Sequence, residues 1–224
     1  MNQDRQRKLT ITGTGSTSGG VFQSVRITGE AEIHGDTESD SLSCTGNCSV
    51  SGSVISRTAR IVGEFEIDGD LKAGKLTALG QLKISGSAKG GVFKIKGQLD
   101  TGGECEAERF ENNGAFQIYG LLSADRVDIG MYGPCYAREI GGAAIRVKRG
   151  RWQGVKELFT RSGAAQLKAE TIEGDSIYVE HTKADVIRGN TVIIGPACDI
   201  GLVEYRSSLE LNKGSVVHAQ KQTK

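Results

Sequence analysis

The chain has 224 residues, with 32 glycines, 2 prolines and only 5% aromatic residues. Its 28 basic and 27 acidic residues leave a formal net charge of +1, so no global field attracts nucleic acid. No apolar run is long enough to span a membrane, and the N-terminus lacks the apolar core of a signal peptide. We therefore expect one elongated domain in the cytoplasm, without a nucleic-acid partner.

Residues 1–8 are predicted to be a flexible tail, and residues 9–147 a regular repeat. Between Ile27 and Gly120, two triplets of the form residue-x-Gly lie six positions apart, and the pair recurs at every seventeenth position. So short a period indicates stacked units that bury their apolar faces against one another. The two series of triplets end in Gly29, Gly46, Gly63, Gly80, Gly97 and Gly114, and in Gly35, Gly52, Gly69, Gly86, Gly103 and Gly120.

Apolar residues recur in columns at the same period, with polar residues between them. This alternation is typical of a strand with one buried face. A repeat of this length fits one coil of a β-solenoid whose glycines mark corners, where a positive φ is often needed. We predict an all-β fold, a single-stranded parallel β-helix with ladders of like side chains inside. Two positions before the first triplet, the ladder is Val25, Leu42, Ala59, Leu76, Phe93, Phe110 and Val127.

Three of the five cysteines, Cys44, Cys48 and Cys105, fall in such inward columns. The spacing of Cys44 and Cys48 could begin a metal site, but no second ligand pair follows at zinc spacing. We interpret these cysteines as core thiols rather than metal ligands or a disulfide. The outward columns carry mixed charges and small polar residues, which indicates a solvated face. We predict no catalytic residue, no metal and no cofactor.

After Ile129 the repeat falters, because residues 130–135 break both glycine columns, and residues 140–147 resume a coil. Residues 148–165 are predicted to be a basic amphipathic insert, either a short helix or a loop. Between Arg146 and Lys168 there are seven basic residues and one acid, Glu157. Four apolar residues of the insert follow a helical spacing. The candidate contact residues for a membrane or a partner are Trp152, Val155, Leu158, Phe159, Arg149, Arg151 and Lys156.

Two interpretations of the insert stay open. A basic amphipathic segment is typical of an interfacial helix that binds an anionic membrane, which would place the protein at the inner face of the membrane. Alternatively, the apolar stripe packs back onto the solenoid as a cap or over a groove, with its charges solvated.

Strands are predicted to return over residues 166–218, in slightly smaller coils. The triplet Ile172-Glu173-Gly174 is followed at a spacing of fifteen by Ile187-Arg188-Gly189, and similar residues come after each triplet. Residues 219–224 are predicted to be a polar tail.

The ladder of aliphatic-x-Gly triplets resembles the bactofilins, the bacterial polymer-forming cytoskeletal proteins. The second block is similar to a longer branch of that family, through residues 173–180, 186–190, 194–196 and 203–205. The resemblance covers most of residues 9–218. It implies a right-handed β-helix that associates with itself into an oligomer or filament without nucleotide. It also implies a non-enzymatic scaffold for cell-envelope or morphology proteins.

A left-handed β-helix acyltransferase of the hexapeptide type is the alternative. Residues 194–201, Ile-Gly-Pro-Ala-Cys-Asp-Ile-Gly, are similar to a hexapeptide repeat. Such enzymes need a histidine as general base. Here His34 is predicted to point outward, His181 to lie in a charged turn and His218 in the tail. The triplet spacing of 6 then 11 also differs from three equal sides. We therefore predict that the protein is not an enzyme.

Overall fold

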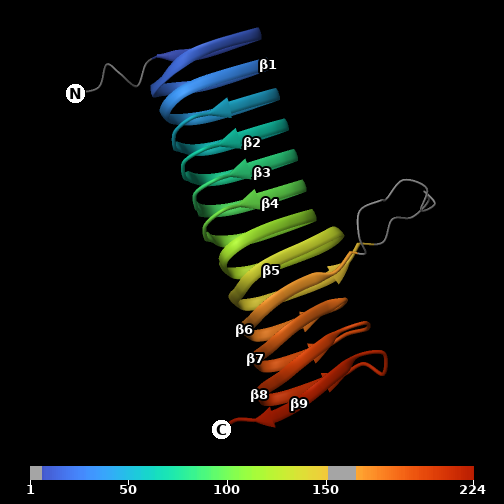
Figure 1. Ribbon diagram of the computed structural model, residues 1–224. Helices are drawn as coiled ribbons and strands as arrows, with labels where there is room; N and C mark the ends of the chain where they lie inside the picture. The colour runs from blue at the N-terminus through green and yellow to red at the C-terminus, as the bar shows by residue number, and fades with distance from the viewer. Residues whose placement is uncertain (1–6, 151–164) are drawn as a thin grey trace, which may run out of the picture.

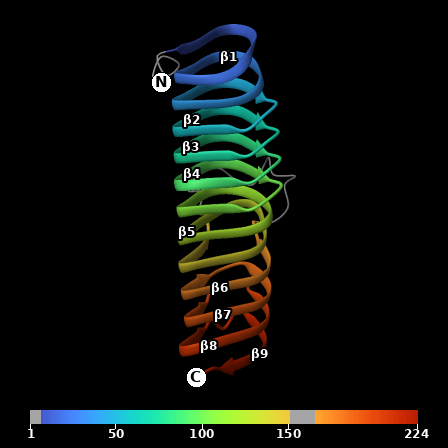
Figure 2. The same ribbon diagram turned by 90° about the vertical axis from the view of Figure 1, so that its left-hand side faces the viewer.

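The computed structural model describes residues 7–150 and 165–224, which form one continuous stack of coils (Figures 1 and 2). All nine strands belong to one parallel sheet, ordered β1 to β9 as in the sequence. The sheet winds about the long axis, so the first coil and β9 lie at opposite ends of the molecule. No helix occurs in the described residues, and so none there is long and apolar enough to cross a membrane. The predicted all-β parallel solenoid is confirmed.

Two strands pass through several corners without interruption, β1 (Lys8–Val50) and β5 (Cys105–Arg149). The others are β2 (Val54–Ile67), β3 (Leu71–Ile84), β4 (Ala88–Thr101), β6 (Leu167–Val179), β7 (Thr182–Ile194), β8 (Asp199–Leu211) and β9 (Val216–Gln222). From β1 to β5 each strand pairs with the next at a sequence offset of seventeen, as Thr37 does with Val54. Between β6 and β7 the offset is fifteen, as Leu167 pairs with Thr182. Both periods agree with those predicted.

The interior holds the predicted ladders. Leu76, Phe93 and Phe110 are register partners in successive coils, and each is 0% exposed. Phe110 meets Phe116 edge to face, with 6.0 Å between ring centroids. Outside, opposite charges stack one coil apart, as in the pairs Lys89–Glu106 at 2.8 Å and Lys94–Glu111 at 3.0 Å. Apolar burial therefore stabilises the stack, and solvated ion pairs add little.

Glycine is required for different physical reasons in the two series. In the first series, φ lies between +122° and +132° from Gly29 to Gly97. A Cβ on Gly80 would also lie 2.2 Å from the carbonyl oxygen of Gly63. In the second series only Gly35 has a positive φ, and the others are required by close approach. For example, a Cβ on Gly86 would lie 2.2 Å from Oδ1 of Asp70. The expected need for positive φ therefore holds for only part of the two series.

The broken glycine columns predicted an interruption of the repeat at residues 130–135, but the coil continues through this stretch. β5 continues through this stretch, and Met131, Cys135 and Ala137 are buried in alternation. Larger inward side chains replace the glycines here without ending the strand.

The two blocks of coils stack directly on one another, because β5 pairs with β6, for example through Val147 and Val179. The prediction of a helix or loop for the insert lies mostly outside the described residues. The described part, through Arg149, still belongs to β5.

The polar tail predicted at residues 219–224 is wrong for most of its length. Residues 216–222 form β9, which pairs in parallel with β8. Side-chain polarity concealed this strand, because an end strand pairs through its backbone and exposes most of its side chains. At the other end, Lys8 already belongs to β1 rather than to the predicted tail.

Three polar side chains in the core lack a hydrogen-bond partner among the described residues, Thr37, Thr101 and Asn112. Asn112 is the register partner of Ile95 and is 0% exposed, and neither its Oδ1 nor its Nδ2 has a hydrogen-bond partner among the described residues. An unpaired buried amide costs about 1–3 kcal/mol. We expect Asn112→Val to raise the free energy of unfolding by roughly 1–2 kcal/mol in urea denaturation. The control Asn113→Val, at an exposed position, should change it little. Destabilisation by Asn112→Val would contradict the assignment of Asn112 as a buried amide without a hydrogen-bond partner.

Candidate functional site

The first coil leaves core side chains partly uncovered. Leu9 and Ile11 pack against the core but are only half-buried. In the following coil, Val25 and Ile27 are each 1% exposed. Within the described residues, no strand pairs with the outer edge of the first coil. This end therefore presents apolar side chains together with free backbone groups.

The last coils are uncovered in the same way. Leu211 is the register partner of Ile194, yet Leu211 is 47% exposed and Ile194 is 0% exposed. β9 pairs with β8 only from Asp199 to Tyr205, so β9 does not cover Leu211. Val217 of β9, the register partner of the buried Ile200, is itself only partly buried. Both ends of the described stack thus expose residues that continue the core columns.

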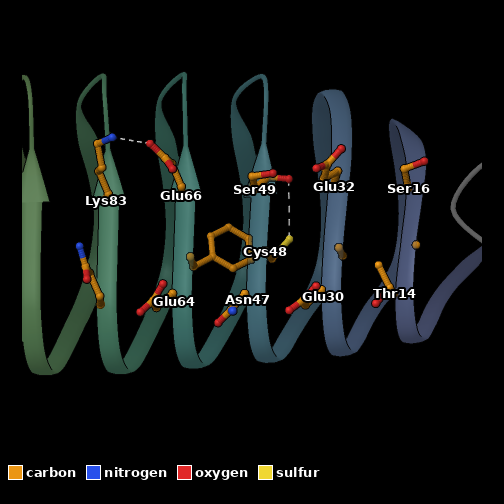
Figure 3. A pocket seen from close by; sticks show the side chains of 14 residues that line it. Thr14, Ser16, Glu30, Glu32, Asn47, Cys48, Ser49, Glu64, Glu66 and Lys83 are labelled. Carbon is orange, nitrogen blue, oxygen red and sulfur yellow. Dashed lines mark hydrogen bonds and ion pairs between the residues drawn. The ribbon is translucent and has the colours of Figure 1, made fainter.

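A shallow groove of about 560 Å³ crosses the N-terminal coils (Figure 3). Apart from Cys48, which lies between them, its labelled side chains form two rows on successive coils, one beginning at Thr14 and the other at Ser16. Four glutamates line it, and Lys83 pairs with one of them, Glu66. Its lining is otherwise mostly small or polar, so the groove is an open face of the stack rather than an enclosed pocket. The lining residues are Thr14, Gly15, Ser16, Glu30, Ala31, Glu32, Asn47, Cys48, Ser49, Glu64, Phe65, Glu66, Gln81 and Lys83.

Three of the five tyrosines, Tyr119, Tyr132 and Tyr136, lie near Gly150 and Lys168. Tyr119 and Tyr136 are in contact, with 6.1 Å between ring centroids. Tyr132 packs over Gly150, where an added Cβ would lie 2.5 Å from its ring. Tyr119 is 58% exposed and Tyr132 48% exposed. We call Tyr119, Tyr132, Pro134 and Tyr136 the tyrosine corner.

Cations flank the tyrosine corner. Lys168 is the register partner of Tyr136 and lines a small hollow together with Pro134 and Tyr136. Arg149 precedes Gly150, and its backbone N–H donates to Oε2 of Glu180 at 3.2 Å. Neither the Lys168 nor the Arg149 side chain forms an ion pair with a described residue. Both charges face solvent beside the exposed rings.

A protein of Bacillus subtilis strain 168 with the name Uncharacterized protein YhbE is 53% identical to this chain over 220 residues. The match covers 90% of this chain and 92% of YhbE. This chain belongs to the YhbE family. A second Bacillus subtilis protein, Uncharacterized protein YhbF, is 38% identical over 99 residues, or 44% of this chain and 40% of YhbF. No protein-family model and no solved structure matches the chain.

In this YhbE-family chain all five cysteines are free and buried. Burial raises the pKa of the Cys105 thiol to about 12, and that of the Cys135 thiol to about 12. A hydrogen bond with the Cys44 thiol, together with burial, raises the pKa of Cys48. Among the described residues no group of side chains is arranged to hold a metal ion. The predicted core position of Cys44, Cys48 and Cys105 is confirmed.

The three histidines lie apart in this member of the YhbE family. His34 is exposed, as predicted, and His181 occupies a turn with φ of 46°. His218 lies on β9 rather than in a tail, and its Nε2 is 2.9 Å from Oδ1 of Asp199. The hydrogen bond from His218 lowers the pKa of the Asp199 carboxyl. Among the three histidines, all of which the structure describes, only His218 is paired with a carboxylate, as a general base with an orienting acid would be.

Of the predicted contact residues, only Arg149 is among those that the structure describes, and it is exposed at the end of β5. Trp152, Val155, Leu158, Phe159, Arg151 and Lys156 lie outside the described residues. Sequence reasoning missed the tyrosine corner, although Tyr119 and Tyr136 stand one repeat period apart in a single outward column of the YhbE-family chain. That spacing was the available signal.

Proposed function

We propose that this protein is a non-enzymatic scaffold that assembles with copies of itself, end to end, into a cytoplasmic oligomer or filament. The observation that carries the proposal is the uncovered core column, in which Leu211 is 47% exposed and its register partner Ile194 is buried. A bactofilin-like polymer of this kind would organise proteins of the cell envelope or of cell morphology.

The physical argument starts from the ends of a wound sheet. An edge strand offers unpaired N–H and C=O groups, which pair readily with another chain. Solenoids stay monomeric when polar capping repeats cover their ends. Here the end columns carry Leu9 and Ile11 at one end and Leu209 and Leu211 at the other. Stacking two ends would pair the backbone edges and bury these side chains. The contact itself supplies the free energy, so assembly needs no nucleotide.

The proposal predicts that one charge at an open end weakens assembly. Wild-type protein is expected to sediment as species larger than the monomer at micromolar concentration, without ATP or GTP. Leu211→Asp would place a carboxylate in the stacking contact, where burial of an unpaired charge is unfavourable. We expect it to shift the protein towards monomer in analytical ultracentrifugation, with association at least about tenfold weaker.

The matched control is Ser41→Asp, which adds the same charge at an exposed position of β1 away from both ends. It should assemble as wild type does. Because Leu211 is half exposed in one chain, Leu211→Asp should keep the wild-type circular dichroism spectrum. Wild-type protein that is monomeric throughout would contradict self-assembly. Assembly unchanged by Leu211→Asp would contradict the C-terminal end as its contact.

A hexapeptide-type acyltransferase is the second candidate, and the His218–Asp199 pair is the observation that favours it. In that function His218 would act as general base on an acceptor hydroxyl or amine. An acetyl-CoA turnover assay separates the two candidates. Turnover that is abolished by His218→Ala would favour the enzyme, and we expect no turnover.

A further inference from the structure

We infer that Cys44 and Cys48 form an oxidation site, at which hydrogen peroxide converts two neighbouring thiols of one chain into a reversible disulfide. The two cysteines flank the corner glycine Gly46 within β1, and their side chains lie in the core, at 0% and 5% exposed. Their thiols are hydrogen-bonded to one another. The site belongs to one chain and does not require end-to-end assembly.

The corner brings the two sulfur atoms together. On a straight strand, residues four positions apart are separated by about 13 Å, whereas a disulfide needs Cα atoms no more than about 7 Å apart. Gly46 turns the chain between the two cysteines with a φ of +122°. The Sγ of Cys44 lies 4.0 Å from the carbonyl oxygen of Gly46, on the inner side of this turn. Two core positions on adjacent walls of the coil therefore become neighbours.

The pairing distinguishes these two cysteines from the other three. All five cysteines lie in the described part of the chain, and only Cys44 and Cys48 are hydrogen-bonded to a second thiol. Cys135 and Cys198 donate to backbone carbonyl oxygens. Burial raises the pKa of the Cys105 thiol to about 12. A buried thiol without a stabilised thiolate is unreactive, so oxidation should select the pair.

The N-terminal groove gives the pair access to an oxidant. Cys48 lines this groove and lies between its two rows of side chains (Figure 3). The hydrogen bond from the Cys48 thiol lowers the pKa of Cys44, because the remaining S–H stabilises the first thiolate of the pair. The thiolate is the form of cysteine that attacks an oxidant. Four glutamates line the groove and repel anions, which favours a small neutral oxidant such as hydrogen peroxide.

The reaction balances with hydrogen peroxide as the oxidant. The thiolate of the pair attacks one peroxide oxygen, the O–O bond breaks, and the departing hydroxide takes a proton to become water. The second sulfur then attacks the resulting sulfenic acid, so that the S–S bond forms, the S–O bond breaks and a second water leaves. Two thiols and one peroxide thus give one disulfide and two waters, and the peroxide takes up the two electrons. A thiol reductant reverses the step by exchange.

Mass spectrometry of the full chain after treatment with hydrogen peroxide tests the inference. The folded protein is oxidised, and its remaining thiols are then alkylated with iodoacetamide in denaturant. Trypsin releases residues 27–57 as one peptide that contains both cysteines. This peptide should lose two hydrogens and escape alkylation at least about tenfold faster than Cys105, Cys135 or Cys198 is oxidised. Dithiothreitol should restore its alkylation. Circular dichroism should show that the protein stays folded in the peroxide.

Two variants separate the pair from a single reactive thiol. In Cys48→Ala, Cys44 should stay alkylated at a peroxide dose that closes the wild-type disulfide, because it has lost its partner. Cys105→Ala is the matched control, since alanine already occupies the register-partner position Ala88, and it should form the disulfide as wild type does. If Cys48→Ala does not fold, wild type and Cys105→Ala still decide the question.

Three results would overturn the inference. The first is a wild-type peptide 27–57 that keeps both alkylations while the other cysteines are oxidised at the same rate. The second is sulfinic or sulfonic acid at Cys48 in place of a disulfide. The third is oxidation of Cys44 that is as fast in Cys48→Ala as in wild type. None of these results depends on assembly, so failure here leaves the proposed scaffold untouched, and a monomeric protein should still form the disulfide.

Discussion

Ile67→Asp is expected to unfold the coils around it. Ile67 is 0% exposed and lies between its register partners Val50 and Ile84 in the core. The substitution removes a buried aliphatic side chain, at about 2–5 kcal/mol, and places a carboxylate where no cation can reach it. A total of roughly 5 kcal/mol or more would consume most of the stability of an ordinary domain. Thermal melting followed by circular dichroism should show loss of the strand signal far below the wild-type transition.

The neighbouring residue provides the control for this prediction. Asp68 follows Ile67 directly, and its side chain is exposed. Asp68→Asn should therefore change the unfolding free energy by less than about 0.5 kcal/mol. Equal sensitivity at positions 67 and 68 would refute the assignment of inward and outward faces.

Gly80→Ala is expected to destabilise the stack strongly, although it adds one methyl group. Gly80 has a φ of +126°, a conformation that an alanine adopts only with strain. The added Cβ would also lie 2.2 Å from the Gly63 carbonyl oxygen, which is backbone and cannot move aside without opening the coil. We expect a loss of about 3 kcal/mol or more in urea denaturation.

Gly141→Ala is the matched control for the corner glycines. Its added Cβ would have only Leu121 Cδ1 within contact distance, at 3.9 Å, and its φ is not in the left-handed region. Gly141→Ala should therefore be neutral or slightly stabilising. If both alanine variants unfolded alike, the close stacking at Gly80 would not be the cause.

The ladders of the core could be predicted because the repeat period of the sequence also determines which residues stack on one another in space. Residues one period apart, such as Leu76 and Phe93, lie on the same wall of neighbouring coils. Pattern alone did not reveal that inward side chains such as Met131 could replace a glycine corner while the strand continued. Nor did it reveal β9, whose polar side chains carry no period-two signal although its backbone pairs with β8.

The candidate surfaces were less predictable for a related reason. Whether Leu211 is covered depends on how far β9 reaches, and only the structure shows that its pairing ends at Tyr205. The tyrosine corner was not predicted because mixed charge dominates the outward columns, whereas Tyr119 and Tyr136 repeat as aromatic rings. The predicted contact residues of the insert, Trp152 and Phe159 among them, lie outside the described residues.

Negative-stain electron microscopy of the purified full chain, without nucleotide, tests end-to-end assembly most directly. The account predicts rods of the width of one solenoid whose lengths exceed that of one chain and grow with protein concentration. The same preparation of Leu211→Asp should show predominantly short particles. Wild-type particles that keep the length of a single chain at every concentration would contradict the account.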